Sequence, residues 1–206
     1  MKFGAYIDGF NLYYALKRLN LRNLYWLDIQ SLSESLTPKT ASLEFVNYYT
    51  SRSKDPRNKG TAARQEVYWQ ALRTLPKVNI VEGKILERDS QCEAACKLGF
   101  KRHQEKETDV KIGIDIIRDC LIKKVQGIIL ITADTDQVPT LQMVKDLNLS
   151  ISVQLATPPS KRRAPRELTN LASKHHGLFP NTLRQHVMPN TIQTASGRIS
   201  KPARWQ

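Results

Sequence analysis

Four aspartates stand where the parallel strands of an α/β sheet would end. Asp8 closes an apolar run at the N-terminus, Asp134 and Asp136 follow a second run, and Asp109 opens a long helical pattern. Since ligands of such sheets bind beyond the carboxyl ends of the strands, we expect the four carboxylates to converge there. Two like charges about 4 Å apart repel by roughly 4 kcal/mol at an effective dielectric constant near 20. A hard divalent cation such as Mg²⁺ prefers oxygen ligands and would relieve this repulsion, so the pattern predicts a metal site.

An amide side chain accompanies the first aspartate. Asn11 follows Asp8 by three residues, across Gly9, where the strand is expected to turn into a helix. Its amide can hydrogen-bond a phosphate oxygen or a bound water in the same pocket without adding negative charge. Gly9 allows a tight turn and the close approach of a neighbouring backbone. The candidate catalytic residues are therefore Asp8, Asn11, Asp109, Asp134 and Asp136.

Each of these residues also has a structural explanation. Asp8 and Asp136 are good N-caps for the helices that follow them, and Asp109 complements the dipole of its own helix. Asn11 is, in the same view, an ordinary polar residue of a first helical turn. One such residue alone favours the structural explanation, but several at the ends of strands expected to be adjacent favour a site.

The elements that must position these side chains alternate between strands and helices. Short runs rich in β-branched and aromatic residues predict strands at residues 3–8, 43–50, 78–84, 127–132 and 150–156. Helical spacing predicts helices over residues 10–19 and 108–123, the second packing Val110, Ile114, Ile117 and Leu121 on the sheet. The fourth run is apolar on both sides, which is typical of a central parallel strand. The predicted fold class is α/β, with a doubly wound and mostly parallel sheet.

Three segments depart from this alternation. Residues 51–60 are polar and rich in turn formers, which predicts a mobile basic loop. Residues 88–107 carry many charges and are expected to form an irregular excursion. Beyond Pro189 no periodicity is found, and these residues are expected to fold only on a partner. The predicted division is a globular domain over residues 1–178 and a basic C-terminal tail over residues 179–206.

The chain is strongly basic. Its 206 residues include 32 Lys and Arg against 19 Asp and Glu, a formal net charge of +13. From residue 161 onward there are nine basic residues and one acid, so eight of the thirteen net charges lie there. Such a segment attracts phosphate chains by releasing their counterions, which predicts a nucleic-acid partner. A solvated tail that aids solubility is the alternative.

Cysteine count and hydropathy indicate a cytoplasmic protein. Three cysteines, Cys92, Cys96 and Cys120, are too few for a disulfide scaffold. No run reaches the roughly 18 apolar residues of a membrane helix, and the N-terminus lacks a signal-peptide pattern. Cys92 and Cys96 with His103 leave a zinc site open, but three soft ligands favour ordinary free thiols.

Three motifs also relate the chain to a known family. They are Asp-Gly-Phe-Asn-Leu-Tyr at residues 8–13, Lys-Glu-Thr-Asp-Val at residues 106–110 with a further acid at Asp115, and Thr-Ala-Asp-Thr-Asp at residues 132–136. With these motifs in this order, the sequence resembles the NYN domain family, the LabA-like branch of the PIN-like metal-dependent ribonucleases. The resemblance implies a three-layer PIN-like sandwich with a five-stranded sheet in the order 3-2-1-4-5, so that residues 1–178 form a nuclease domain. It also implies an Mg²⁺ or Mn²⁺ site built from Asp8, Asp109, Asp134 and Asp136, with Asn11 beside it.

The predicted function is a metal-dependent ribonuclease that hydrolyses RNA phosphodiester bonds. A noncatalytic RNA-binding module and a phosphatase or nucleotide hydrolase on the same fold are the alternatives. RNA and a second copy of the chain are the candidate partners, with no membrane involved. Tyr13, Tyr14 and Tyr49 are candidate platforms for base stacking. Candidate contacts to the RNA backbone are Arg52, Arg57, Lys106, Lys161, Arg162 and Arg163.

Overall fold

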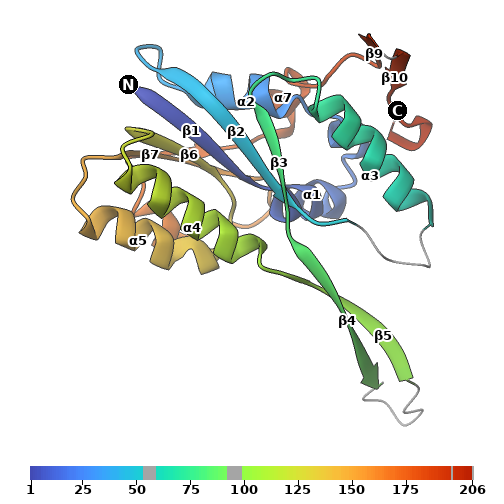
Figure 1. Ribbon diagram of the computed structural model, residues 1–206, viewed down its shortest axis with the longest axis horizontal. Helices are drawn as coiled ribbons and strands as arrows, with labels where there is room; N and C mark the ends of the chain where they lie inside the picture. Colours follow the sequence, from blue (N-terminus) through green and yellow to red (C-terminus); the bar gives the residue numbers. More distant parts are fainter. Residues whose placement is uncertain (53–58, 92–98, 196, 206) are drawn as a thin grey trace.

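A six-stranded parallel sheet forms the centre of the protein (Figure 1). The computed structural model describes residues 1–52, 59–91, 99–195 and 197–205. The strands are β1 (Lys2–Asp8), β2 (Ser42–Thr50), β3 (Val78–Glu82), β6 (Gly127–Ile131), β7 (Ser152–Thr157) and β8 (Lys174–Gly177). They are arranged in the order β3-β2-β1-β6-β7-β8. The expected order 3-2-1-4-5 is confirmed for the first five strands, and β8 adds a sixth at the edge.

The sixth strand was not predicted because its sequence is polar. β8 reads Lys-His-His-Gly, without the apolar alternation that marks a strand. Its pairing with β7 is supported by two side-chain hydrogen bonds, His175 Nε2 to Thr157 Oγ1 at 2.9 Å and His176 Nε2 to Gln154 Oε1 at 3.0 Å. An edge strand of this kind is therefore defined by its neighbour rather than by its own hydropathy.

Helices cover both faces of the sheet, which confirms the three-layer sandwich. On one face lie α1 (Gly9–Arg18), α2 (Ile29–Leu36) and α3 (Lys59–Leu72), whose apolar residues share a core with Ile129 and Ile131. On the other lie α4 (Thr108–Leu121), α5 (Val138–Asp146) and the short α6 (Arg166–Thr169), which pack with Ile128 and Leu130. The middle strand β6 is therefore buried on both sides, as its continuous apolar run predicts.

The orientation of α4 differs from the prediction. Ile112, Ile116 and Cys120 pack into the core, whereas Val110 and Ile114 are mostly exposed. The expectation that the predicted stripe faces the sheet is therefore wrong for Val110, Ile114 and Leu121, whereas Ile117 is partly buried against the core. Both stripes have helical spacing, and the stripe that is buried also carries a polar side chain. This is Asp119, whose carboxylate accepts a hydrogen bond from Tyr6 Oη at 2.9 Å and is paired with Arg118.

The expected irregular excursion is a β-hairpin. β4 (Lys84–Gln91) pairs antiparallel with β5 (Gly99–Lys106), and the ribbon projects away from the sheet in Figure 1. Its strands are polar and lack clear alternation, so hydropathy gave no signal for them. Cys92 and Cys96 fall outside the described residues, and for His103 only the backbone is described, so zinc binding there stays untested.

The residues after Pro189, expected to lack structure of their own, fold onto the body. β9 (Thr191–Thr194) and β10 (Gly197–Ser200) form a hairpin, and η4 (Ala203–Trp205) brings Trp205 onto Tyr25 and Trp26. Tyr25 belongs to η1 (Arg22–Tyr25), and α7 (Pro180–Arg184) precedes the hairpin. Trp205 is 8% exposed and belongs to the core that lies under α1 to α3. Trp205, together with Ile192 and Ile199, thus anchors a largely polar segment on the core, which periodicity cannot reveal.

No helix within the described ranges combines the length and the apolar character needed to cross a bilayer.

Candidate metal centre

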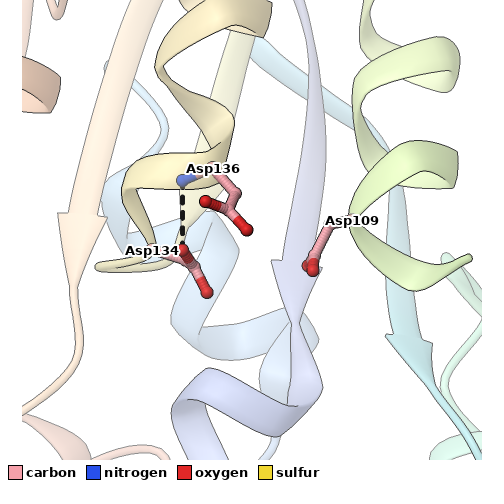
Figure 2. A group of neighbouring side chains, drawn as sticks. All are labelled: Asp109, Asp134 and Asp136. Atoms are coloured by element: carbon pink, nitrogen blue, oxygen red, sulfur yellow. Dashed lines mark hydrogen bonds between the residues drawn. The ribbon is translucent and has the colours of Figure 1, made fainter. Parts of the chain in front are cut away.

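Three carboxylates meet at the carboxyl edge of the sheet (Figure 2). Asp109, Asp134 and Asp136 each contribute one oxygen to a group in which all the oxygens lie within 4.8 Å of one another. Asp109 and Asp134 are half-buried, and Asp136 is exposed. The convergence predicted for these three residues is confirmed, although they come from elements about 25 residues apart.

The segment after β6 holds two of the three acids in place. Asp134 caps η3 (Thr135–Gln137) by accepting a hydrogen bond from the Asp136 N–H at 3.0 Å. Pro139 then opens α5, a position where its missing N–H costs nothing. The cap that was expected from Asp136 is therefore supplied by Asp134 instead. The same carboxylate serves the cap and the cluster, so capping does not argue against a site.

A buried glutamine links this segment to Asp109. Gln137, only 1% exposed, donates from Nε2 to the Asp109 carbonyl at 3.0 Å, and its Oε1 accepts from Thr140 Oγ1 at 3.1 Å. The residue before α4, Glu107, has a left-handed backbone (φ 77°) and pairs with Lys111 at 3.5 Å. Gln137 is therefore a positioning residue that the sequence analysis missed. Its contact with the Asp109 carbonyl joins segments 28 residues apart, so the sequence around Gln137 carries no signal for this role.

Asp8 lies beside the three-carboxylate group, but it is not one of its members. It is 3% exposed, and its carboxylate accepts from the Asn11 N–H and from Thr132 Oγ1, both at 2.9 Å. Burial raises the pKa of Asp8 to about 6, and the charges of Asp109 and Asp134 add to the effect, while the two hydrogen bonds oppose it. A metal-ligand role for Asp8 stays a prediction.

Asn11 connects α1 to the segment that carries the acids. Its Oδ1 accepts from the Ala133 N–H at 3.0 Å. The turn before it brings the start of α1 close to β2, since a Cβ on Gly9 would lie 2.6 Å from the Tyr49 carbonyl oxygen. The expected close backbone approach at Gly9 is confirmed. The amide of Asn11 thus lies at the same edge as the acids, and a direct contact to substrate stays a prediction.

The donor set fits a hard divalent cation. Three carboxylates supply only oxygen atoms, the ligands that Mg²⁺ and Mn²⁺ prefer. The repulsion between the three negative charges would be relieved by a cation between them. The sides of this site are formed by β1 and by the beginnings of α1, α4 and η3.

The predicted RNA contacts are distributed unevenly. Lys161, Arg162 and Arg163 are exposed on the loop after β7, at the same edge of the sheet as the acids. Arg52 instead pairs with Glu66 at 2.9 Å and stacks on Trp69, which gives it a structural role. Arg57 lies outside the described residues, and Lys106 is described only as the last backbone position of β5.

The predicted stacking platforms are only partly available. Tyr49 is fully buried and donates to Asp115 Oδ2 at 2.8 Å, so stacking on this residue is excluded. Tyr13 is half-buried, and Tyr14 is exposed on α1 one turn after Asn11.

Comparison with known proteins identifies the family. The model of the NYN domain matches residues 2–179, nearly the whole chain. The chain belongs to the NYN domain family. This confirms the resemblance inferred from the three motifs, and members of the family are generally nuclease-like.

Two individual proteins resemble this NYN protein. A 6-hydroxy-3-succinoylpyridine 3-monooxygenase, HspA, of Pseudomonas putida is 25% identical over 233 aligned positions, which span 97% of this chain and 74% of the relative. The crystal structure of a protein of unknown function from Vibrio parahaemolyticus superposes with a TM-score of 0.58 at 16% identity, covering 87% of this chain and 94% of that one. The second similarity supports the PIN-like fold, not an activity.

Proposed function

We propose that this NYN protein is a metal-dependent ribonuclease that hydrolyses RNA phosphodiester bonds at its acidic centre. The observation that carries the proposal is the convergence of Asp109, Asp134 and Asp136 at the carboxyl edge of the sheet. Family membership and a net charge of +13 add support, because a basic protein attracts the phosphate backbone of RNA. A cytoplasmic location, inferred from the sequence, belongs to the same proposal.

The acidic residues have different roles in this proposal. Asp109, Asp134 and Asp136 would hold Mg²⁺ or Mn²⁺, which when bound supplies Lewis acidity and a water of lowered pKa. Asp8 accepts from Thr132 Oγ1, and this hydroxyl in turn accepts from the Asp134 N–H at 3.1 Å. The chain of hydrogen bonds makes Asp8 a support for the segment that carries the acids, in addition to its predicted role as a ligand.

The surroundings of the centre are suited to RNA. Lys161, Arg162 and Arg163 extend from the neighbouring strand at the same edge, where they would contact phosphates on one side of the cleaved bond. The ring of Tyr14 on α1 is partly exposed but already stacks with Phe10 and lies under Lys17 Nζ, so a base would have to replace one of these contacts to stack on it.

The first test is cleavage of labelled single-stranded and structured RNA with Mg²⁺, with Mn²⁺ and with a chelator. The substitution Asp134→Asn should lower cleavage by more than about 100-fold, because even groups behind metal ligands contribute 10- to 100-fold. RNA affinity should be retained, since a negative charge facing the backbone is removed. Asp146→Asn, at the far end of α5, is the matched control and should cleave normally.

The results separate the proposal from its alternatives. Cleavage that is indifferent to chelator, or unchanged in Asp134→Asn, would overturn the proposed mechanism. Tight RNA binding with no cleavage under any metal would favour the noncatalytic RNA-binding module. The Pseudomonas relative is named as a monooxygenase, and RNA hydrolysis is distinguished from that chemistry because it consumes neither oxygen nor a reductant.

A further inference from the structure

The β4–β5 hairpin, here called the ribbon, divides its charged residues between two faces. In an antiparallel pair, residues directly opposite each other belong to the same face, and the face alternates along each strand. The register pairs Lys84 with Lys106 and Arg88 with Arg102, and these four positions belong to one face, here called the basic face. Its other positions in the described strands are uncharged: Leu86, Ser90, Phe100 and Gln104.

The opposite face holds the acids of the ribbon. Its positions include Glu87, Asp89 and Glu105, and Lys101 lies directly opposite Asp89 in the register. Opposite charges at facing positions stabilise an antiparallel pair, whereas like charges at facing positions destabilise it. The acidic face thus contains a favourable pair, and the basic face contains two unfavourable ones. The separation of charge is therefore not explained by the stability of the ribbon itself.

The ribbon begins beside the metal centre. β3 continues through Gly83 into β4, and β5 leads through Glu107 into α4, whose second residue is Asp109. At this base, Lys84 pairs with Glu107 at 3.2 Å. Beyond the ion pair, the ribbon projects away from the body (Figure 1). Each strand has 8 residues, so the ribbon reaches roughly 25 Å at about 3.3 Å per residue.

The ribbon and the loop after β7 lie on opposite sides of the metal centre. The strand order β3-β2-β1-β6-β7-β8 places the end of β3 on one side of β1 and β6, and the end of β7 on the other. The carboxylates lie at the ends of the middle strands β1 and β6. The exposed Lys161, Arg162 and Arg163 follow β7. An RNA strand laid along this edge would meet the loop first, then the carboxylates and then the ribbon.

We propose that the basic face of the ribbon is an arm that binds the phosphate backbone of RNA on the side of the metal centre away from β7. The inference rests on the proposed ribonuclease function and adds the substrate class, an RNA long enough to reach from the metal centre to the ribbon. A row of basic residues without acids attracts a polyanion, which releases its counterions on binding. Phosphates on this face would also relieve the repulsion expected between arginines at facing positions 88 and 102.

RNA binding without cleavage tests the arm. Fluorescence anisotropy in the presence of a chelator measures the affinity for labelled single-stranded RNA. Arg102→Gln should lower the affinity about threefold and reduce the slope of its logarithmic salt dependence by about 0.7, the contribution of one phosphate contact. Adding Arg88→Gln should bring the loss to about tenfold. In a series of shortened RNAs, the difference from wild type should disappear when the RNA no longer reaches the ribbon.

Lys101→Gln is the matched control. It removes the same charge from the neighbouring position on the acidic face, so its RNA affinity should equal that of the wild type. Arg102→Gln removes a like-charged pair, so it should not destabilise the ribbon, and thermal unfolding of both variants checks this. Equal losses of affinity in Arg102→Gln and Lys101→Gln would overturn the proposal, because the effect would then follow net charge and not one face.

Two further results would also overturn the proposal. One is an unchanged RNA affinity in the double variant Arg88→Gln, Arg102→Gln. The other is a double variant that keeps its RNA affinity but loses binding to phosphatidylserine vesicles, which would assign the face to a membrane. The arm and the activity fail separately. RNA bound through the basic face but never cleaved would overturn the ribonuclease and support the arm, whereas cleavage with unchanged affinity in the double variant would do the reverse.

Discussion

At the scale of single residues, the metal centre shows how one side chain serves both structure and chemistry. Asp134 caps η3 and also belongs to the acidic cluster. Asp8 caps α1 by accepting from the Asn11 N–H, and it also accepts from Thr132 Oγ1. The two explanations offered by the sequence, capping and metal binding, are therefore compatible. A cap fixes the orientation of a carboxylate, which is also what a metal ligand requires.

Asp8 should make stability depend on pH in the metal-free protein. Its pKa is about 6 in the folded state, against an ordinary value of 3.8, because burial disfavours the charged form. Because the pKa of Asp8 is raised on folding, protonated Asp8 stabilises the folded state fully below about pH 4. This contribution to the free energy of unfolding is lost as the pH rises through about 6. The shift corresponds to about 3 kcal/mol at 1.36 kcal/mol per pKa unit.

The variant Asp8→Asn isolates this contribution, because other acids titrate in the same range. Urea unfolding in the presence of a chelator measures the free energy of unfolding of both proteins. Relative to the wild type, Asp8→Asn should be more stable at pH 7 than it is at pH 4. An equal difference at both pH values would contradict the raised pKa.

At the scale of elements, the site depends on how η3 and α4 are joined. The two elements belong to separate parts of the chain, and Gln137 connects them through the Asp109 carbonyl. α4 also illustrates that an amphipathic pattern can carry two apolar stripes, of which the sheet buries one. The buried stripe also takes Asp119 into the interior, and this is tolerated because Tyr6 and Arg118 satisfy its carboxylate.

Gln137→Ala should weaken metal binding without replacing any ligand. Loss of a buried hydrogen bond costs about 1–3 kcal/mol of stability, and the freed start of α4 should lower Mn²⁺ affinity roughly 10- to 100-fold. Calorimetric titration with Mn²⁺ measures the affinity. Gln142→Ala, at an exposed position of α5, is the matched control. Equal Mn²⁺ affinities of the two variants would argue against a positioning role for Gln137.

At the scale of the whole molecule, the C-terminal segment is part of the folded body. Trp205 packs on Tyr25, Trp26 and Tyr68, and buried Lys201 donates from Nζ to the Asn23 carbonyl at 3.1 Å. The basic residues of this segment are therefore held on a defined surface, next to the layer of α1 to α3. Their contribution to RNA affinity would depend on that placement as well as on their charge.

Trp205→Ala should destabilise the protein by about 3 kcal/mol, the usual cost of truncating a buried aromatic side chain. Urea unfolding followed by circular dichroism measures this change. If removal of the ring left the unfolding midpoint unchanged, the packing of the C-terminal segment would contribute nothing to stability. Trp205→Phe, which keeps an aromatic ring, should recover part of the loss.

The order of the first five strands was implied by the resemblance to the NYN domain family. Hydropathy and motif spacing were sufficient for the α/β class and for the meeting of Asp109, Asp134 and Asp136. These features follow from local patterns, since a buried parallel strand must be apolar and the carboxyl ends of adjacent strands must share one edge. Long-range contacts decided the rest. The polar strand β8, the buried face of α4, the role of Gln137 and the docking of Trp205 each depend on a partner that is distant in the chain. The hydropathy pattern of a segment reflects only its own residues and not the residues it will contact from elsewhere in the chain. Such features can therefore be seen only in the folded structure.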